Sequence, residues 1–380
     1  MDELSTQAWT RDRILNELNS LPDPLQYGGA SLASVLEQSF PIFLDSLATS
    51  QEDMKMWTEY STGPPRVFPS ENCWSTVAPT YREAFSQMLE ARDGKDIICQ
   101  VNGYNSTFSE ALMVIQSTDP ICPNSHLQEV LRQDQACILN MEPPNRSREH
   151  IRLPAAAADI ELIDDDHISY GMNLCSYGSF VDIHIDHGQE VLSTLLDRCV
   201  KLWLLYPPTP HNLKIFGMNN LNSGRVHRWH SQLEGAVVIV TDRKSTIYLP
   251  CGALHATVTI HPGFLVGQDF VTTRTVKTLF HYLPAQIDAC PEAIEDEVDI
   301  FLKALKSALN TPGTSQVDAL EGWISHGPSI LRKLANYGYQ YQKLIHDALL
   351  ENLPQDLPNG CPCGEYFRCS VKIHFKRQHL

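Results

Sequence analysis

The sequence predicts an α+β protein, with a β-rich core between two helical segments. Between about residues 160 and 271, short runs rich in Val, Ile, Tyr and Leu recur with turn residues between them, which is the pattern of a closed or sandwiched all-β unit. On either side of this stretch, apolar residues recur at helical spacing. The chain has 380 residues, 43% of them apolar, so it can bury a sizeable core.

Before the core, the sequence predicts broken helices followed by a mixed region. Helical spacing over Trp9–Leu18 and Ser31–Leu47 indicates two helices. The proline-rich segment Gly63–Pro69 indicates an extended connector. Beyond it, Asp96–Val101 has the pattern of a strand and Phe108–Gln116 that of a helix.

Within the core, several runs have the length and composition of strands. They include Ile183–Ile185, Lys201–Tyr206, Val237–Thr241, Ser245–Leu249 and Phe264–Val271. Further along, an apolar face from Ile294 to Leu309 indicates a helix, and Ile330–Leu350 is expected to form one more. We therefore divide the chain into an N-terminal mixed region (1–155), a β core (156–284), a helical region (285–355) and a C-terminal segment (356–380).

Composition excludes some classes of function and indicates a compartment. A net charge of −16 argues against a surface built to coat nucleic acid, because phosphate binding needs clustered Lys and Arg. No apolar run approaches the roughly 18 residues that span a bilayer, and the start of the chain lacks the features of a secretory signal. The 11 cysteines are mostly scattered, which indicates free thiols in a reducing compartment. We expect an intracellular protein without membrane contact, whose sequons at Asn105 and Asn145 carry no glycan.

The candidate metal ligands begin in the segment Val181–Gly188. In a strand, alternate side chains share a face, so His184 and Asp186 are expected to point the same way. A third ligand has to come from another strand, and the candidate is His255, which follows a Pro/Gly turn. Two histidines and one carboxylate form the facial ligand set of non-haem Fe(II) oxygenases, which leaves positions open for a co-substrate and O₂. A structural zinc site would instead be closed by four protein ligands.

Lys201 adds context to a pattern that is weak by itself, since His-x-Asp also occurs by chance and a lone histidine in a strand is more often a core or surface residue. Lys201 lies in the otherwise apolar run Val200–Tyr206, and an unpaired buried ammonium is very costly. The distal carboxylate of 2-oxoglutarate would be a fitting partner. The alternative is a lysine that extends from an edge strand into solvent.

Together these motifs resemble the Jumonji C (JmjC) domain of Fe(II)- and 2-oxoglutarate-dependent oxygenases, with the greatest likeness to JmjC histone lysine demethylases. The resemblance covers about residues 160–273. It rests on H-I-D-H-G from His184, on K-L-W-L-L-Y-P-P-T from Lys201, 17 residues later as in that group, and on three further runs. These are Ser245–Pro250, Gly252–Ala256 and Gly267–Phe270.

The resemblance implies a fold, a metal and a reaction. The fold would be a double-stranded β-helix, a jelly-roll or cupin-like barrel of about eight strands, flanked by N-terminal and C-terminal helices. His184, Asp186 and His255 would bind Fe(II), while Lys201 and Thr194 would contact 2-oxoglutarate. O₂ and 2-oxoglutarate would yield succinate, CO₂ and an oxidised protein side chain. The expected function is demethylation of a histone tail in the nucleus.

Four positions depart from the demethylase pattern. Val181 stands where that group has a Thr, Thr194 where it has a Tyr, His187 where it has a Phe and Asp269 where it has an Asn. We interpret them as a reshaped pocket that keeps its metal ligands and its lysine. His187 is expected to face away from the metal and to be structural.

Two other functions stay open beside demethylation. One is protein hydroxylation by the same chemistry. The other, favoured only by Val181, is a chromatin-associated binding module that binds iron weakly. The resemblance also implies that the N-terminal region borders the substrate groove and that the C-terminal helices buttress the core or form a homodimer. Asp164–Asp166 is read as a solvated turn or a steering element for basic substrates, and His227 and His230 as surface residues.

The last twenty residues resemble a shortened C2H2 zinc finger. The candidate zinc ligands are Cys361, Cys363, His374 and His379, with Cys369 as an alternative to Cys361. Only one residue separates the first two cysteines, where a C2H2 finger has two to four, and the alternative is a basic disordered tail. One finger reads about three base pairs, so sequence-specific DNA binding is not expected.

Overall fold

A computed structural model describes most of the chain, including all the candidate metal ligands. The described residues are 9–20, 32–39, 51–80, 82–84, 86, 98–101, 104–107, 109, 137–141, 150–157, 160, 162–163, 168–196, 198–217, 224–357, 360–365 and 369–380. The acidic run Asp164–Asp166, the sequon at Asn145 and, apart from Ser109, the predicted helix Phe108–Gln116 lie outside these ranges.

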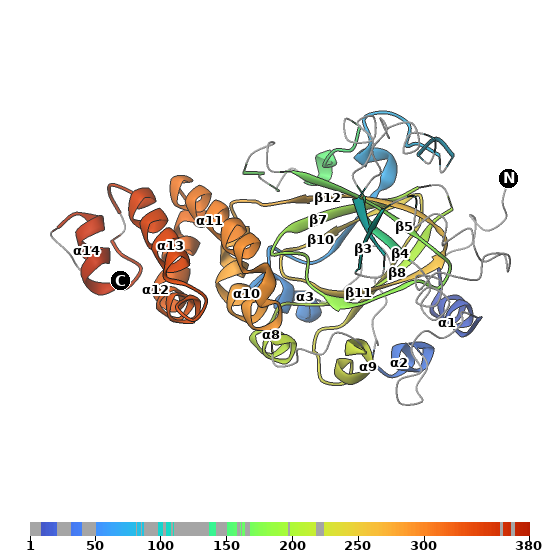
Figure 1. Cartoon of the computed structure of the whole chain (residues 1–380), viewed down its shortest axis with the longest axis horizontal. Helices are drawn as coiled ribbons and strands as arrows, with labels where there is room; N and C mark the ends of the chain where they lie inside the picture. The colour runs from blue at the N-terminus through green and yellow to red at the C-terminus, as the bar shows by residue number, and fades with distance from the viewer. Residues whose placement is uncertain are drawn as a thin grey trace.

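Among the described residues, most strands lie in the middle of the chain, and the longest helices follow them at the C-terminal end (Figure 1). The strands are β1 (Arg66–Pro69), β2 (Ile98–Val101), β3 (Tyr104–Thr107), β4 (Cys137–Met141), β5 (Ser169–Cys175), β6 (Phe180–His184), β7 (Glu190–Leu195), β8 (Val200–Tyr206), β9 (Val237–Thr241), β10 (Ser245–Leu249), β11 (Leu254–His261) and β12 (Gly263–Phe270). The helices are α1 (Arg11–Ser20), α2 (Leu32–Ser39), α3 (Gln51–Tyr60), α8 (Pro210–Gly217), α9 (Arg225–Trp229), α10 (Thr275–Ala289), α11 (Ile294–Asn310), α12 (Thr314–Leu334), α13 (Tyr339–Asn352) and α14 (Val371–Gln378).

The strands form two antiparallel sheets. The larger sheet has the order β1-β10-β7-β12-β5-β4-β2-β3, and the smaller sheet has the order β6-β11-β8-β9. From β5 to β12 the chain passes back and forth between the two sheets. The prediction of an α+β protein is confirmed, with antiparallel sheets that are compatible with a β-sandwich and helices that follow them.

Strand β8 illustrates how the sequence builds the core. All of its residues are buried, as expected for a strand that is covered on both faces. Leu202 and Leu204 pack into a core that the smaller sheet shares with the C-terminal helices. Trp203 and Leu205 alternate with them and pack into a separate core together with residues of the larger sheet. The two-residue period of a strand therefore turns one face of β8 toward the helices and the other toward the opposite sheet.

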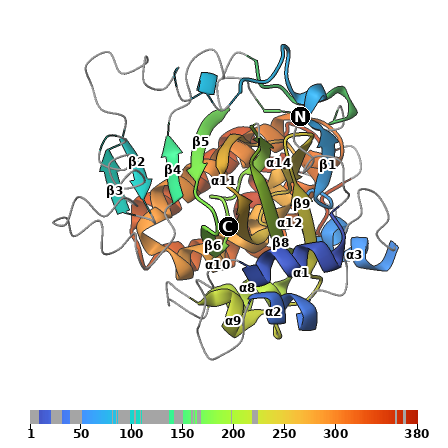
Figure 2. The ribbon, with the colours of Figure 1, turned by 90° about the vertical axis from the view of Figure 1, so that its right-hand side faces the viewer.

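The N-terminal region contributes strands as well as helices to the fold. β1 pairs with β10 at one edge of the larger sheet, while β4, β2 and β3 extend the sheet beyond β5 at the other edge (Figure 2). The segment Gly63–Pro69, predicted as a connector, therefore contains a strand. Pro69 is tolerated because it ends an edge strand, where no partner needs its missing N–H. The larger sheet thus crosses the predicted boundary at residue 155.

Helices α10 to α13 form a bundle beside the sheets, with α10 nearest to them (Figure 1). The predicted boundary at residue 284 falls inside α10. The prediction of one helix over Ile330–Leu350 is wrong, because α12 ends at Leu334 and α13 begins at Tyr339. Gly338 lies between them with a φ of 142°, a conformation that a side chain disfavours and that breaks the helix.

Two expectations about the environment of the chain concern membranes and disulfides. Within the described ranges, no helix is both long and apolar enough to cross a bilayer. The cysteines whose side chains are described are free thiols, most of them buried. They therefore contribute to the core as small apolar side chains.

Candidate metal centre

His184, Asp186 and His255 come from two neighbouring strands of the smaller sheet. His184 is the last residue of β6, Asp186 follows in the turn, and His255 is the second residue of β11. His184 and His255 face each other in the antiparallel register of β6 and β11, and the centroids of their rings are 4.1 Å apart. The sheet register itself brings the two histidines together.

The three side chains converge on one point. Nε2 of His184 lies 3.5 Å from Oδ1 of Asp186, and Nε2 of His255 lies 3.3 Å from Oδ2. The opposite ring nitrogens are already engaged, since Nδ1 of His184 donates to the carbonyl of Asp182 (2.8 Å) and Nδ1 of His255 to that of Ala253 (3.1 Å). With the proton on Nδ1, each Nε2 directs a lone pair at the common point, as in metal-binding histidines.

Burial and charge act in opposite directions on the pKa values of these groups. Burial opposes the charged form of Asp186, but the facing histidines outweigh it and lower the pKa of the carboxyl. Burial lowers the pKa of His255 to about 4, and Asp186 offsets this effect only in part. For His184 burial is outweighed by the hydrogen bond and charge of Asp186, which raise its pKa. His255 is therefore a neutral donor and Asp186 an anion near neutral pH, which are the states that a metal requires.

One side of this centre opens into a cavity of about 300 Å³. The side chain of His255 is 4% exposed, whereas those of His184 and Asp186 are each 34% exposed. Both sheets contribute to the cavity wall, and the residues considered below are Val181, His187, Ser193, Lys201, Thr257 and Asp269. Three donors on one side and open space on the other distinguish this centre from a closed structural zinc site.

Lys201 projects from β8 into the wall of the same cavity. It is 3% exposed, and its Nζ lies 6.0 Å from the centre of the Trp203 ring. β8 is an inner strand, paired with β11 on one side and β9 on the other. The alternative of a lysine extending from an edge strand is therefore wrong, and the ammonium is held inside the core.

Thr194 is not brought to the cavity. Its hydroxyl lies 3.0 Å from that of Ser70, while its neighbour Ser193 lines the cavity. Adjacent residues of a strand point to opposite faces, so the tenth residue after His184 is turned away from the metal ligands. The cavity also contains Thr257, which faces Val181 in the pairing of β6 and β11. Ser193 and Thr257 therefore bring hydroxyl-bearing residues to the cavity wall, at positions that the sequence did not indicate.

Two turns that contain glycine pack the ligand-bearing segments closely against α10. Gly188 (φ 62°) follows the carboxylate ligand, and Gly252 (φ 74°) precedes the second histidine ligand. A Cβ atom on Gly188 would lie 2.6 Å from Leu279, and one on Gly252 would lie 2.9 Å from Thr278. Both positions therefore require glycine for backbone conformation and for space.

Cys251 ties these two turns to each other. Its buried thiol donates to the carbonyl of Gly188 at 3.1 Å, and its own carbonyl accepts a hydrogen bond from Ser61 at 2.7 Å. The sequence did not single out Cys251, because an isolated cysteine has the pattern of an ordinary core residue. Its contact with the other turn depends on which strands become neighbours.

Asp182 links β6 to α9, and the sequence analysis did not identify it either. Its carboxylate accepts hydrogen bonds from the backbone N–H groups of Arg225 (2.6 Å) and Val226 (2.9 Å) at the start of α9. The guanidinium of Arg225 donates to the carbonyl of Ile183 at 2.8 Å. Since the carbonyl of Asp182 holds the His184 ring, α9 helps to orient this ligand in the manner of an outer-shell partner.

His187 lines the cavity, contrary to the expectation that it faces away from the metal. Its Nδ1 lies 3.2 Å from Oε1 of Glu297 in α11. Glu297 is fully buried and also accepts hydrogen bonds from Tyr282 (3.1 Å) and Gln286 (3.2 Å). The hydrogen bond that His187 donates to Glu297 raises the pKa of His187, although burial opposes this. The expectation failed because β6 ends at His184, and His187 has a φ of 27°, so strand alternation does not extend to it.

Asp269 also lines the cavity. Burial and the nearby charge of Asp186 raise the pKa of its carboxyl to about 7, although a hydrogen bond from Ser169 (3.2 Å) opposes the shift. In the chain without metal, this carboxyl therefore titrates near neutral pH.

The four C-terminal ligand candidates form a second group, away from the sheets. Among the described residues, Cys361, Cys363, His374 and His379 can hold one metal ion, and Cys369 is not part of the group. The two histidines of the α9 region, His227 and His230, belong to neither group.

Comparison with known proteins gives a partial relationship. A stretch of 109 residues is 31% identical to "JmjC domain-containing histone demethylation protein 1" of Kluyveromyces lactis. The match covers 28% of this chain and 22% of the relative, so the chain spans about a fifth of that protein's length. No family model matches the chain. The similarity supports a relationship to JmjC proteins.

Proposed function

Starting from this relationship, we propose that the chain is an Fe(II)- and 2-oxoglutarate-dependent dioxygenase that acts on a protein side chain, with demethylation of histone methyl-lysine as its reaction. The observation that carries the proposal is the convergence of His184, Asp186 and His255 on one side of a cavity that also holds the buried Lys201. Two neutral imidazoles and one carboxylate are the ligand set of the non-haem Fe(II) oxygenases.

The residues present fit Fe(II). When bound, iron would supply the activation of O₂ for oxidation of a C–H bond, coupled to decarboxylation of 2-oxoglutarate. The chain itself holds the donors in register, fixes the tautomer of both histidines and leaves one side of the centre facing the cavity. The order β10-β7-β12-β5 in one sheet and β6-β11-β8-β9 in the other supports the inference that these strands form a double-stranded β-helix.

Lys201 would pair with the distal carboxylate of 2-oxoglutarate. A charge-assisted hydrogen bond is strongest where water is excluded, and the lysine is buried at the cavity wall. Val181 offers no hydrogen bond at its position, so we assign the neutral hydrogen bonds to the co-substrate to Ser193 and Thr257, which line the same cavity.

The substrate would approach past the N-terminal strands. Gln100 of β2 and Leu139 of β4 contribute to the cavity wall, so these strands would border a substrate groove. A net charge of −16 favours encounter with a basic chain such as a histone tail. The name of the yeast relative refers to histone demethylation, and we therefore place the proposed activity in the nucleus.

Two residues of the cavity wall favour hydroxylation as the second candidate. Val181 and Asp269 both line the cavity and both depart from the demethylase pattern. In a hydroxylase the oxidised side chain would be a stable alcohol, whereas on an N-methyl group it would release formaldehyde. The mass of the peptide product separates the two, because one oxygen is gained in the first case and one methylene is lost in the second.

The test is succinate formation by the purified full chain with Fe(II), ascorbate, 2-oxoglutarate and a pool of histone peptides. His184→Ala removes a metal ligand and should reduce succinate formation by more than the roughly 100-fold typical for outer-shell partners of a metal. The matched control is His211→Ala, which removes an exposed histidine of α8 and should leave turnover unchanged.

Equal succinate formation by His184→Ala and the unaltered chain would contradict the proposal. If no sample forms succinate and calorimetry detects no binding of 2-oxoglutarate, a binding module without turnover becomes the better description.

A further inference from the structure

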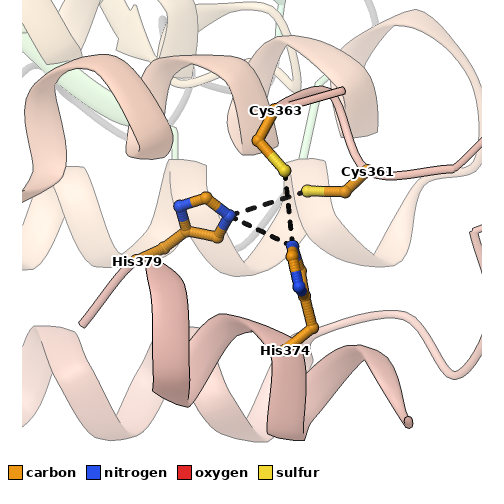
Figure 3. A group of neighbouring side chains, drawn as sticks. All are labelled: Cys361, Cys363, His374 and His379. Atoms are coloured by element: carbon orange, nitrogen blue, oxygen red, sulfur yellow. Dashed lines mark hydrogen bonds between the residues drawn. The ribbon is translucent and has the colours of Figure 1, made fainter. Parts of the chain in front are cut away.

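A second set of metal-ligand side chains lies at the C-terminus, beyond α12 and α13 and away from the sheets (Figure 1). Cys361 and Cys363 lie in a turn closed by a hydrogen bond from the N–H of Gly364 to the carbonyl of Cys361 (3.0 Å). His374 lies on α14 and His379 just after it. Figure 3 shows the four side chains directed at one another.

The separations between their donor atoms match a tetrahedron around zinc. Bonds of about 2.3 Å to sulfur and about 2.05 Å to nitrogen place two nitrogens about 3.3 Å apart, and a nitrogen and a sulfur about 3.6 Å apart. Nε2 of His374 lies 3.3 Å from Nε2 of His379. The sulfur of Cys361 lies 3.7 Å from Nε2 of His379, and that of Cys363 lies 3.4 Å from Nε2 of His374 (Figure 3).

Hydrogen bonds alone account poorly for this arrangement. A neutral imidazole Nε2 carries either one proton or one lone pair, so it can point at a single partner. Each Nε2 here faces both a sulfur and the other Nε2. One ion at the centre satisfies all four atoms at once, because every lone pair then points to the same place.

The group is also built into the core of the bundle. Cys361 is 6% exposed and His374 is 4% exposed. Val371 and Phe375, the apolar residues of α14, are buried in the same core as the helices of the bundle. The indole N–H of Trp323 in α12 donates to the carbonyl of His379 at 3.2 Å. The face of α14 that carries the ligand is thus turned toward the bundle.

We propose that Cys361, Cys363, His374 and His379 form a closed structural Zn²⁺ site that fastens the C-terminal segment to the helical bundle. Binding would release two thiol protons to solvent and leave two thiolates and two neutral imidazoles around Zn²⁺, a site with no net charge. All four positions are taken by protein, so the ion holds the chain together and performs no chemistry. This site is independent of the proposed oxygenase activity.

Cobalt(II) is the probe that separates this site from the central one. In the full chain, one equivalent of Co²⁺ bound here should produce the intense absorption of sulfur-to-cobalt charge transfer, which His184, Asp186 and His255 cannot give because they contain no sulfur. Zn²⁺ should abolish the absorption by displacing Co²⁺. The unaltered protein should also be isolated with one zinc that survives His184→Ala.

Cys363→Ser should remove the charge-transfer absorption and the isolated zinc, while the matched variant Cys369→Ser should keep both. Limited proteolysis adds a readout that does not depend on a variant, since removal of zinc from the unaltered chain should expose residues 361–380 to cleavage. A chain that gives no charge-transfer absorption with Co²⁺, or that loses it equally in Cys369→Ser, would overturn the proposal.

Discussion

The central and C-terminal metal-ligand groups use histidine in opposite settings. The central group offers three donors without sulfur, two of them one-third exposed beside a cavity. The C-terminal group offers four donors, including two thiols, and two of its residues, Cys361 and His374, are buried while the other two are partly buried. In the centre, sheet register and hydrogen bonds to the ligands set the geometry, so an ion can be added and still have free positions. At the C-terminus the donors surround the point completely, so an ion can only hold the segment in place.

Metal exchange should give the largest effect, and it tests directly whether the two groups have different roles. After removal of all metal with a chelator, Fe(II) alone should restore succinate formation without restoring the melting temperature, because only the central group turns over. Zn²⁺ alone should restore the melting temperature without succinate, since structural zinc contributes directly to folding. Succinate formation and thermal unfolding are measured on the same samples. Recovery of both properties with either ion alone would show that the two groups are not specialised.

Lys201→Met should have the second-largest effect. It tests whether the open central site has a residue that binds the co-substrate in addition to the metal ligands. The substitution removes the charge and keeps an apolar chain in the buried position. Loss of a charged hydrogen bond of about 1.5–3 kcal/mol should raise the KM for 2-oxoglutarate roughly 10- to 100-fold. Binding of Fe(II) and of Zn²⁺ should be unchanged. An unaltered KM would exclude Lys201 as the co-substrate ligand.

Cys251→Ala tests whether contacts within the fold hold the central ligands. The buried thiol ties the 188 turn to the 251 turn, so its loss should destabilise the protein by about 1 kcal/mol and weaken Fe(II) binding up to roughly tenfold. Cys290→Ala, at a half-buried cysteine, is the control. Thermal unfolding and Fe(II) titration check both effects. Zinc content should not change, because Cys251 lies outside the C-terminal group.

Asp269→Asn should give the smallest change in stability. It tests the effect of placing a second carboxylate near Asp186 when no metal is bound. In the metal-free protein the pKa of Asp269 is raised to about 7, so between about pH 4 and 7 the folded state keeps a proton that the unfolded state releases. Stability should therefore fall as pH rises through this window, and the variant should not show that fall. At pH 8 we expect the variant to be more stable by about 1 kcal/mol, a value reduced for water in the cavity. Parallel pH profiles of the two proteins would exclude this account.

The sequence predicted those parts of the site that depend on local pattern. Strand predictions over Val237–Thr241 and Ser245–Leu249 coincide with β9 and β10, because short β-branched runs between turns have few alternatives. His184 and His255 come together if the two strands that carry them pair. The resemblance to the JmjC domain predicts this pairing, because the motifs stand in the same order and at the same spacing.

The remainder depends on contacts between distant segments. Thr194 was expected at the cavity, but its neighbour Ser193 lines the cavity and Thr194 points to the other face of the strand. The orientation of His187 was inferred from strand alternation, although β6 ends three residues earlier, at His184. Glu297 lies in a helix that reads as an amphipathic segment, yet it is fully buried against the turn that carries Asp186. No local pattern in the sequence shows that α11 reaches this turn.

The two glycine turns have a consequence for how the chain can be divided. Neighbouring side chains of α10, Thr278 and Leu279, occupy the space beside Gly252 and Gly188. One helix of the bundle therefore serves as the back wall for both ligand-bearing turns. A chain shortened at residue 284 would cut this wall within α10, so we expect the sheets to need the first helix of the bundle in order to fold.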